Sequence, residues 1–317
     1  MGYVGKNYMR QGGRDWRIGG SITILPGGQI SFLSPRKSVY FVDSTVTASG
    51  DGLSWATAFK TIAEAVALAV AGDTIYIYSG TGTAHEFAES IAITSLAGIQ
   101  FIGGGTNPDQ AVWTGLAGHA LTFTDSADFF VSNIRFRPAN GYGGVSLVGA
   151  SSYGTIFKNR LQGMSGSKYG IVSDGQQSGL KVLDNDFMYF NAATCYGIYA
   201  PIYGTTAENA SWEIARNKFH GNTYHLKGNF RYSDIIENTF GGYGLLSTGA
   251  QGAPTKCLDL TPATGSVGNN QVTRNSFGGD YTTALYVSAN ANDDWIGNYA
   301  YHATTAPYGL TIAIPGA

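Results

Sequence analysis

The sequence predicts an all-β solenoid, a parallel β-helix, because one short phrase returns along the chain at a variable spacing. The phrase is an apolar residue, two or three spacers, an Asn, one further residue and then usually a large apolar residue. It is centred on Asn159, Asn185, Asn217, Asn238, Asn275 and, more weakly, Asn298. A helical repeat would hold its length, whereas stacked strands accept insertions as loops on one side of each coil.

The residues around each Asn favour two short strands joined by a bend. They are rich in Val, Ile, Phe, Tyr and Thr, which suit strands. Asn tolerates the left-handed backbone conformation better than other non-glycine residues, so we expect it at the bend itself. Stacked coils would bring these side chains into a ladder in which each amide bonds the next. A second family of strands lies between the phrases, at residues 170–173, 196–200, 256–260 and 284–287.

This repeat resembles the right-handed parallel β-helix superfamily, which includes pectate lyases and many viral tailspikes. The segment 54–77 adds to the resemblance, because an alanine-rich stretch at 63–71 leads directly into a strand. Phe59, Ile62, Val66 and Val70 fall on one helical face, and Gly72 suits the end of a helix.

In the resembled superfamily a short amphipathic helix in this position covers the N-terminal end of the solenoid. It hides strand edges that would otherwise invite aggregation. The resemblance covers residues 39–317, which we assign to the β-helix domain. At the other end, the strand-like segment 310–314 has no folded cap after it, and we expect chain association or the final loops to protect it.

Residues 1–38 do not belong to the repeat and form a separate N-terminal segment. Residues 21–25 and 29–32 alternate apolar and polar side chains around a Pro-Gly-Gly turn, which predicts a small strand pair without a helix. So short a segment cannot bury a core alone, so it must dock on the solenoid, on copies of itself or on a partner.

The phrase at 13–28 resembles N-terminal segments of bacteriophage head-fibre and head-decoration proteins, in which such a segment precedes a variable outer domain. The resemblance implies a capsid anchor, and the alternative is a strand pair packed along the solenoid. The candidate capsid-attachment residues are Arg14, Trp16, Arg17, Ile18, Ile22 and Ile24.

Composition excludes several classes of function. The net charge of −2 gives no basic footprint for nucleic acid. No apolar run is long enough to span a membrane, and residues 1–20 lack the apolar core of a signal peptide. Cys195 and Cys257 are expected to be reduced core thiols, and the five His residues show no metal-ligand spacing, so no metal or cofactor is predicted.

A catalytic constellation is not evident in the sequence. Glycoside hydrolysis needs two carboxylates facing each other across the sugar, about 5 to 9.5 Å apart. The first candidates for an enzyme are Asp184, Asp186, Asp293 and Asp294. The first two straddle a bend and the last two are adjacent on one strand, where side chains point to opposite faces. The galacturonase motifs and the pectate lyase arginine motif are also missing from the repeat.

The sequence therefore predicts a bacteriophage virion structural protein of the capsid decoration or head-fibre type, rather than an enzyme. Its expected partners are a major capsid protein or another virion protein, two further copies in a homotrimer, and a cell-surface glycan. Assembly is expected in the host cytoplasm, with the virion as destination. The alternative is a tailspike or other polysaccharide depolymerase, a lyase or a hydrolase, and a third hypothesis is a non-catalytic glycan-binding module.

Overall fold

The computed structural model describes residues 37–81, 85–192, 194–201, 209–241, 256–260, 268–277 and 292–300, with the backbone of 8–9, 16–17 and 286–287. The chain divides into two compact units, Met1–Arg36 and Lys37–Ala317. In the first unit, β1 (Tyr8–Met9) pairs antiparallel with β2 (Trp16–Arg17). The strand pair expected at 21–32 lies outside the described residues, as does the C-terminal segment 310–314.

The second unit contains three long sheets, named sheet 1, sheet 2 and sheet 3. Sheet 1 has ten strands in the order β3 (Val39–Asp43), β4 (Thr74–Tyr78), β7 (Gln100–Gly103), β10 (Phe130–Ser132), β13 (Thr155–Phe157), β16 (Lys181–Leu183), β20 (Glu213–Ala215), β24 (Asp234–Ile236), β27 (Gln271–Thr273) and β30 (Asp294–Ile296). Sheet 2 consists of β5 (Phe87–Ala88), β8 (Val112–Thr114), β11 (Arg135–Phe136), β14 (Arg160–Gln162), β17 (Asp186–Met188), β21 (Lys218–His220), β25 (Thr239–Phe240), β28 (Ser276–Phe277) and β31 (Tyr299–Ala300). Sheet 3 consists of β6 (Ile91–Thr94), β9 (Leu121–Thr124), β12 (Gly143–Val148), β15 (Tyr169–Asp174), β18 (Tyr196–Ala200), β22 (Tyr224–Gly228), β26 (Lys256–Asp259) and β29 (Tyr286–Val287). A short parallel pair joins β19 (Asn209–Ala210) to β23 (Phe230–Arg231).

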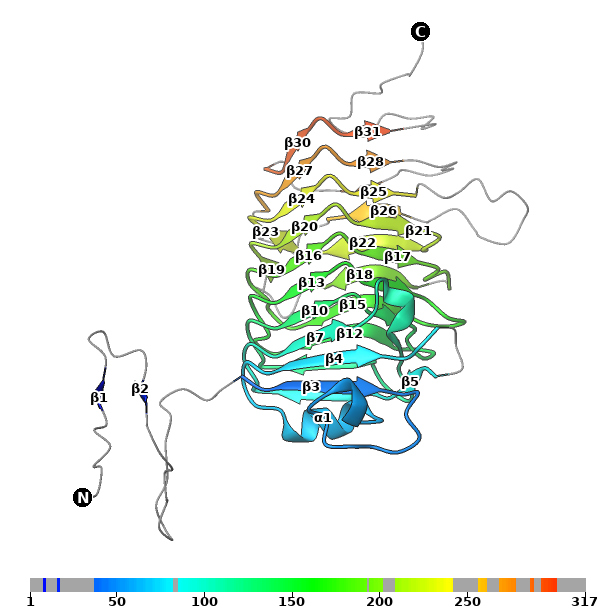
Figure 1. The fold of residues 1–317 in the computed structure, drawn as a ribbon. Coiled ribbons are helices and arrows are strands. Elements are labelled where there is room, and N and C mark those ends of the chain that lie inside the picture. The colour runs from blue at the N-terminus through cyan, green and yellow to red at the C-terminus, as the bar shows by residue number, and fades with distance from the viewer. Residues whose placement is uncertain are drawn as a thin grey trace, which may run out of the picture. The chain divides into compact units, whose positions relative to one another are not determined.

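The strands of each sheet stack one above the other along the solenoid, as Figure 1 shows. Every described pairing in sheets 1 to 3 is parallel. β3 and β4 both belong to sheet 1, and from β4 onward the chain passes from sheet 1 to sheet 2 to sheet 3 in turn. One coil therefore contributes one strand to each sheet. The predicted all-β parallel β-helix is confirmed.

The predicted asparagine ladder runs through the corner between sheet 1 and sheet 2. The Oδ1 atom of Asn185 accepts from the backbone nitrogen of Asn159 at 2.9 Å and from its Nδ2 at 3.1 Å. The same two bonds recur at each later step, from Asn185 to Asn298. Each Nδ2 also donates to a buried carbonyl, such as Val182 O from Asn217 at 2.7 Å. The ladder thus satisfies backbone groups that a corner would otherwise leave unpaired.

The left-handed residue at this corner precedes each Asn, so the expectation that Asn itself takes that conformation is wrong. Lys158, Asp184, Arg216, Glu237 and Arg274 have φ between 53° and 57°. The reversed assignment has a simple reason. The left-handed residue turns the chain and leaves its side chain outside, and the next side chain then points inward, where an amide can bond the coils above and below.

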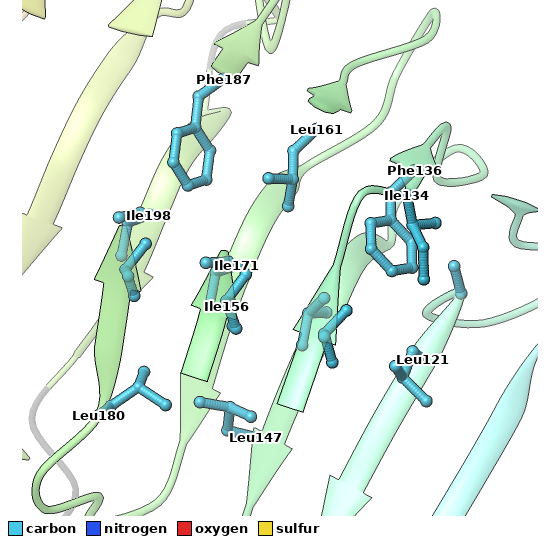
Figure 2. Packing of buried hydrophobic residues seen from close by; sticks show 14 of the residues in the cluster. Leu121, Ile134, Phe136, Leu147, Ile156, Leu161, Ile171, Leu180, Phe187 and Ile198 are labelled. Carbon is cyan, nitrogen blue, oxygen red and sulfur yellow. The ribbon is translucent and has the colours of Figure 1, made fainter. Parts of the chain in front are cut away.

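The core is a stack of aromatic rings on sheet 2 opposite a column of glycines on sheet 3. Ring centroids are 4.6 Å apart between Phe187 and Phe219, and 5.0 Å apart between Phe219 and Phe240. A Cβ on Gly170 would lie 2.7 Å from the Phe187 ring, so a side chain there would collide with the stack. Aliphatic residues from all three sheets fill the rest of the interior, and Figure 2 shows Leu121, Leu161, Ile171 and others pointing into it.

The glycine column ends at His225, which takes the next inward position of sheet 3 and is completely buried. Asn222 is oriented by two backbone bonds, because its Oδ1 accepts from Phe190 N and its Nδ2 donates to Phe187 O, both at 3.0 Å. Its Nδ2 also donates to His225 Nδ1 at 3.1 Å, which places the imidazole hydrogen on Nε2. That Nε2 atom is buried without a hydrogen-bond partner. Burial, followed by the nearby His220, lowers the pKa of His225 to about 3.

The predicted capping helix is α1 (Ile62–Leu68), which lies at the β3 end of the stack in Figure 1. Thr61 and Glu64 form a capping box, and the Glu89 carboxylate accepts from Ile62 N at 3.0 Å and Ala63 N at 2.9 Å. The helix is shorter than predicted and Val70 is 51% exposed. It ends early because the buried Asp73 carboxylate accepts from Val70 N at 2.9 Å. The two 3₁₀ turns are η1 (Trp55–Thr57) and η2 (Pro108–Gln110).

Candidate functional site

The outer face of sheet 3 carries a cluster of stacked tyrosines. Tyr169, Tyr196 and Tyr224 occupy one register position on β15, β18 and β22, and Tyr199 lies in the next outward row. Ring centroids are 4.5 Å apart for Tyr196 and Tyr199, 4.8 Å for Tyr196 and Tyr224, and 5.4 Å for Tyr169 and Tyr199. We call these four residues the tyrosine face.

Charged groups border the tyrosine face. The Lys168 ammonium lies 5.2 Å from the centre of the Tyr169 ring, within the range of a cation–π contact. Lys227 lies one strand from Asp259, with Nζ 3.5 Å from Oδ2, and the Asp259 side chain is only 3% exposed. The face therefore combines aromatic rings, phenol hydroxyls and ammonium groups on one surface.

The Tyr196 phenol is a hydrogen-bonding group rather than a base. Burial, followed by the neighbouring Tyr199 and Tyr224, raises the pKa of Tyr196 to about 12. A general base works best when its pKa is near the operating pH. Tyr196 therefore keeps its proton at neutral pH, which suits binding of a polar ligand and does not suit proton abstraction.

The sequence positions these tyrosines through a short local pattern. Tyr169, Tyr196 and Tyr224 each lie two residues before a buried aliphatic residue, as in Tyr196-Gly197-Ile198. The intervening residue faces the aromatic stack and is Gly170, Gly197 or His225. The sequence predicted strands at 170–173 and 196–200, whereas β22 and the tyrosine face were not predicted. The available signal was the tyrosine at the first position of three of these strands. It identifies a shared surface only once the register of strand pairing is known.

A second polar cluster covers the outer face of sheet 2 and includes Asp186. The Arg160 Nη1 atom lies 2.7 Å from both carboxylate oxygens of Asp109. Asp186 Oδ1 lies 2.8 Å from His220 Nε2, and Asp186 Oδ2 lies 3.5 Å from Arg160 Nε. Arg135 also contacts Asp109. Burial lowers the pKa of the Arg135 guanidinium, and the negative charge of Asp109 acts in the opposite direction. Both oxygens of Asp186 thus face a cation or an imidazole, as in an ion-pair network that holds strands together.

The other candidate acids lie in separate surroundings. Asp184 is the left-handed corner residue before Asn185, and its carboxylate bonds Arg216 at 3.1 and 3.2 Å. Asp293 accepts from Asn270 N at 2.9 Å and from its Nδ2 at 3.0 Å, continuing a second polar ladder. Asp294 begins β30 on the outer face of sheet 1 and is exposed. The structure places Asp184 and Asp186 on different sides of the corner, and Asp293 and Asp294 lie at β30, four strands along sheet 1 from β16.

Among the candidate attachment residues, the structure describes the backbone of Trp16 and Arg17, which form β2. Arg14, Ile18, Ile22 and Ile24 lie outside the described residues. Cys195 and Cys257 are buried in the core, as predicted, and burial raises the pKa of the Cys195 thiol. Within the described ranges no three His, Cys, Asp or Glu side chains are grouped as metal ligands. No helix in those ranges is long and apolar enough to cross a membrane.

Comparison with known proteins identifies the fold. No protein-family model matches the chain, and a search of curated proteins found no match. Among solved structures, pectate lyase Pel9A has a TM-score of 0.55 at 16% identity, over 88% of this chain and 73% of that chain. A rhamnogalacturonan lyase has a TM-score of 0.55 at 13% identity, over 84% of this chain and 74% of that chain. ORF18 of Geobacillus virus E2 has a TM-score of 0.49 at 14% identity, over 82% and 60% of the two chains.

The first two similarities, together with the parallel stacked sheets, show that the chain folds as a right-handed parallel β-helix. The recognised fold is thus confirmed. A fold of this kind hosts many activities, so function has to be argued from the surfaces described above.

Proposed function

We propose that this chain is a bacteriophage virion structural protein of the capsid decoration or head-fibre type. Residues 1–38 attach to a major capsid protein or another virion protein, and the β-helix projects from the particle. The observation that carries the proposal is the phrase at 13–28, which resembles head-fibre and head-decoration segments. The division of the chain into a small N-terminal unit and a solenoid supports it.

Binding to purified particles tests the attachment. Fluorescently labelled full-length chain is mixed with virions from the source that encodes it and separated on a density gradient. The proposal predicts that the wild type migrates with the particles and that Trp16→Ala combined with Arg17→Ala does not. Tyr153→Ala is the matched control, because Tyr153 is 63% exposed on the solenoid. The attachment would be contradicted if the wild type, the double variant and the control all migrate with the particles to the same extent. It would also be contradicted if none of the three migrates with the particles.

The tyrosine face supports a glycan-binding role for the projecting solenoid. Aromatic rings with hydroxyl and ammonium groups at their edges match the mixed apolar and polar surface of a sugar. Biolayer interferometry of the full-length chain on immobilised capsular polysaccharide, lipopolysaccharide, pectate and alginate would measure this. We expect Tyr199→Ala to weaken binding about tenfold or more and Tyr153→Ala to leave it unchanged. Equal binding by both variants would exclude the tyrosine face as the glycan-binding site.

The depolymerase alternative has less support from the described residues. Asp184, Asp186 and Asp293 each have a cation, imidazole or ladder amide against the carboxylate, and Asp294 lies on another sheet from Asp186. We therefore expect no release of unsaturated or reducing ends from the same polysaccharides. Cleavage that disappears when all four aspartates are replaced by alanine would establish the enzyme instead.

A further inference from the structure

The cap at the β3 end of the solenoid presents an uncharged outer face. Helix α1 buries Ile62 and Ala65 and packs against β3 and β6. Its outer side is made of small or aliphatic residues, and a further aliphatic residue follows directly after the helix. We call these exposed residues, Ala63, Ala67, Leu68 and Val70, the cap face. The Leu68 side chain is 55% exposed.

An apolar outer face is unusual for the cap of a solenoid. A helix at a protein surface normally carries charged or polar residues on the side away from the core. The end units of a repeat protein likewise need a polar outer face to stay soluble. The carboxylates on and beside α1 are held at the helix start, where Glu64 bonds Thr61 and Ser49 and Glu89 bonds two backbone amides. The cap face is therefore a surface of the kind that an assembly covers.

The cap face lies where the chain enters the solenoid. The buried Asp73 carboxylate joins the two places, because its Oδ1 accepts from Ser38 N at 2.7 Å and its Oδ2 accepts from Val70 N at 2.9 Å. The Lys37 side chain lies against Gly72, where an added Cβ would be 3.1 Å from Lys37 Cε. Residue 37 is the first of the solenoid unit. The cap face is thus at the end of the solenoid to which residues 1–36 are covalently joined.

We propose that the cap face binds the same virion protein to which residues 1–36 attach, as a second and apolar contact. This inference rests on the proposed function. The contact that it adds lies on the solenoid and not in the N-terminal segment. The matching surface of the partner is uncharged, because a charge buried against these four side chains would have no partner of opposite sign.

The size of the cap face favours a tethered partner over a second copy of the chain. A seven-residue helix is about 10 Å long and about 10 Å wide, so one side of it covers about 100 Å². Leu53, which is 63% exposed, belongs to the segment that covers the edge of β3. Even with Leu53 included, the area of about 200 Å² is far below the roughly 800 Å² that one partner buries in a standard interface. A free second copy would not be held by so small a surface.

A tether makes a small surface effective. Once residues 1–36 are bound, the contact at the cap face forms within the same complex, and its effective concentration is set by the connection rather than by the free protein. Most effects of such a contact fall on the rate of dissociation. We therefore expect the cap face to slow release from the particle more than it changes the rate of association.

Equilibrium binding of the labelled full-length chain to purified particles tests the inference. Leu68→Gln combined with Val70→Gln makes the cap face polar, and both side chains are more than half exposed, so folding should be unaffected. We expect this cap-face variant to bind the particles with a dissociation constant raised about tenfold or more, mainly through faster release. Tyr153→Gln is the matched control, because Tyr153 is 63% exposed on the solenoid, and it should bind as the wild type does.

Thiol labelling provides a second measurement that does not depend on weakened binding. Val70→Cys and Tyr153→Cys each add one exposed thiol to a chain whose own cysteines, Cys195 and Cys257, are buried. A maleimide dye should label both variants at similar rates in the free chain. On particles, labelling of Val70→Cys should slow in proportion to the fraction of chains bound, whereas labelling of Tyr153→Cys should not change.

The outcomes separate this inference from the proposed function. A wild type that does not bind particles contradicts both. Wild-type binding that Trp16→Ala with Arg17→Ala abolishes, but that is equal for the cap-face variant and its control, contradicts the inference alone. Unchanged labelling of Val70→Cys on particles would also contradict it. If light scattering gives the free cap-face variant a lower mass than the free wild type, the face binds a second copy and the inference is overturned.

Discussion

Replacing Asn217 by Ala would remove the centre of the asparagine ladder. The Asn217 side chain accepts from Asn185 N at 2.9 Å and from Asn185 Nδ2 at 3.0 Å, and it donates to Val182 O at 2.7 Å and Asn238 Oδ1 at 3.0 Å. All of these groups are buried. At about 1 kcal/mol for each of four hydrogen bonds, the free energy of unfolding should fall by about 4 kcal/mol.

The matched control is Asn107→Ala, which removes one exposed bond to Asp109 N at the start of η2. Loss of such a cap should cost about 1 kcal/mol or less. Urea unfolding followed by circular dichroism would give both values, with tryptophan fluorescence as a second probe. Two probes are needed because solenoids can unfold part by part. If Asn217→Ala costs no more than Asn107→Ala, the four buried hydrogen bonds of Asn217 do not stabilise the fold.

Three further substitutions have defined outcomes. His225 has its pKa lowered to about 3 in the folded state, so the unfolded state takes up the proton first and stability is lost as the pH falls below about 6.5. Wild type should therefore lose about 2 kcal/mol more than His225→Leu between pH 7 and pH 5 in urea unfolding, and equal pH dependence would refute this. Glu89→Ala removes both bonds to the first amides of α1 and should lower the unfolding free energy by about 1 to 3 kcal/mol, whereas no change would mean that water replaces the carboxylate. Gly170→Ala should lower the melting temperature because its Cβ would lie 2.4 Å from the Gly197 carbonyl oxygen and 2.7 Å from the Phe187 ring, while Gly118→Ala, with 3.4 Å to its nearest neighbour, should not. Equal effects would contradict the close packing of sheet 3 at Gly170.

The regular part of the fold was predictable from sequence because the physics there is local and repeated. The Asn phrase encodes both the corner and the inward aromatic residue, so the coils from Asn159 to Asn298 and their ladder could be foreseen. The left-handed position could not be assigned to Asn or its neighbour from propensity alone. The end of α1 was missed because it depends on a bond from Val70 N to Asp73, a buried side chain beyond the helix.

The surfaces were less predictable than the coils. The tyrosine face combines residues from three coils, and loops of unequal length separate them in the sequence. Whether Tyr169 and Tyr196 share a row depends on the register of strand pairing, which the sequence does not state directly. The four candidate aspartates were visible as residue types, but their partners, such as His220 for Asp186, come from neighbouring coils.

The central claim is that the chain is part of a virion, attached through its N-terminal segment. Immunogold electron microscopy of purified particles, with antibodies raised against the solenoid, tests it most directly, and mass spectrometry of the same particles identifies the chain. We expect gold on intact particles, distributed over the heads, and peptides of this chain among the structural proteins. Particles without label and without its peptides, with the chain recovered only from the soluble fraction of the lysate, would contradict it.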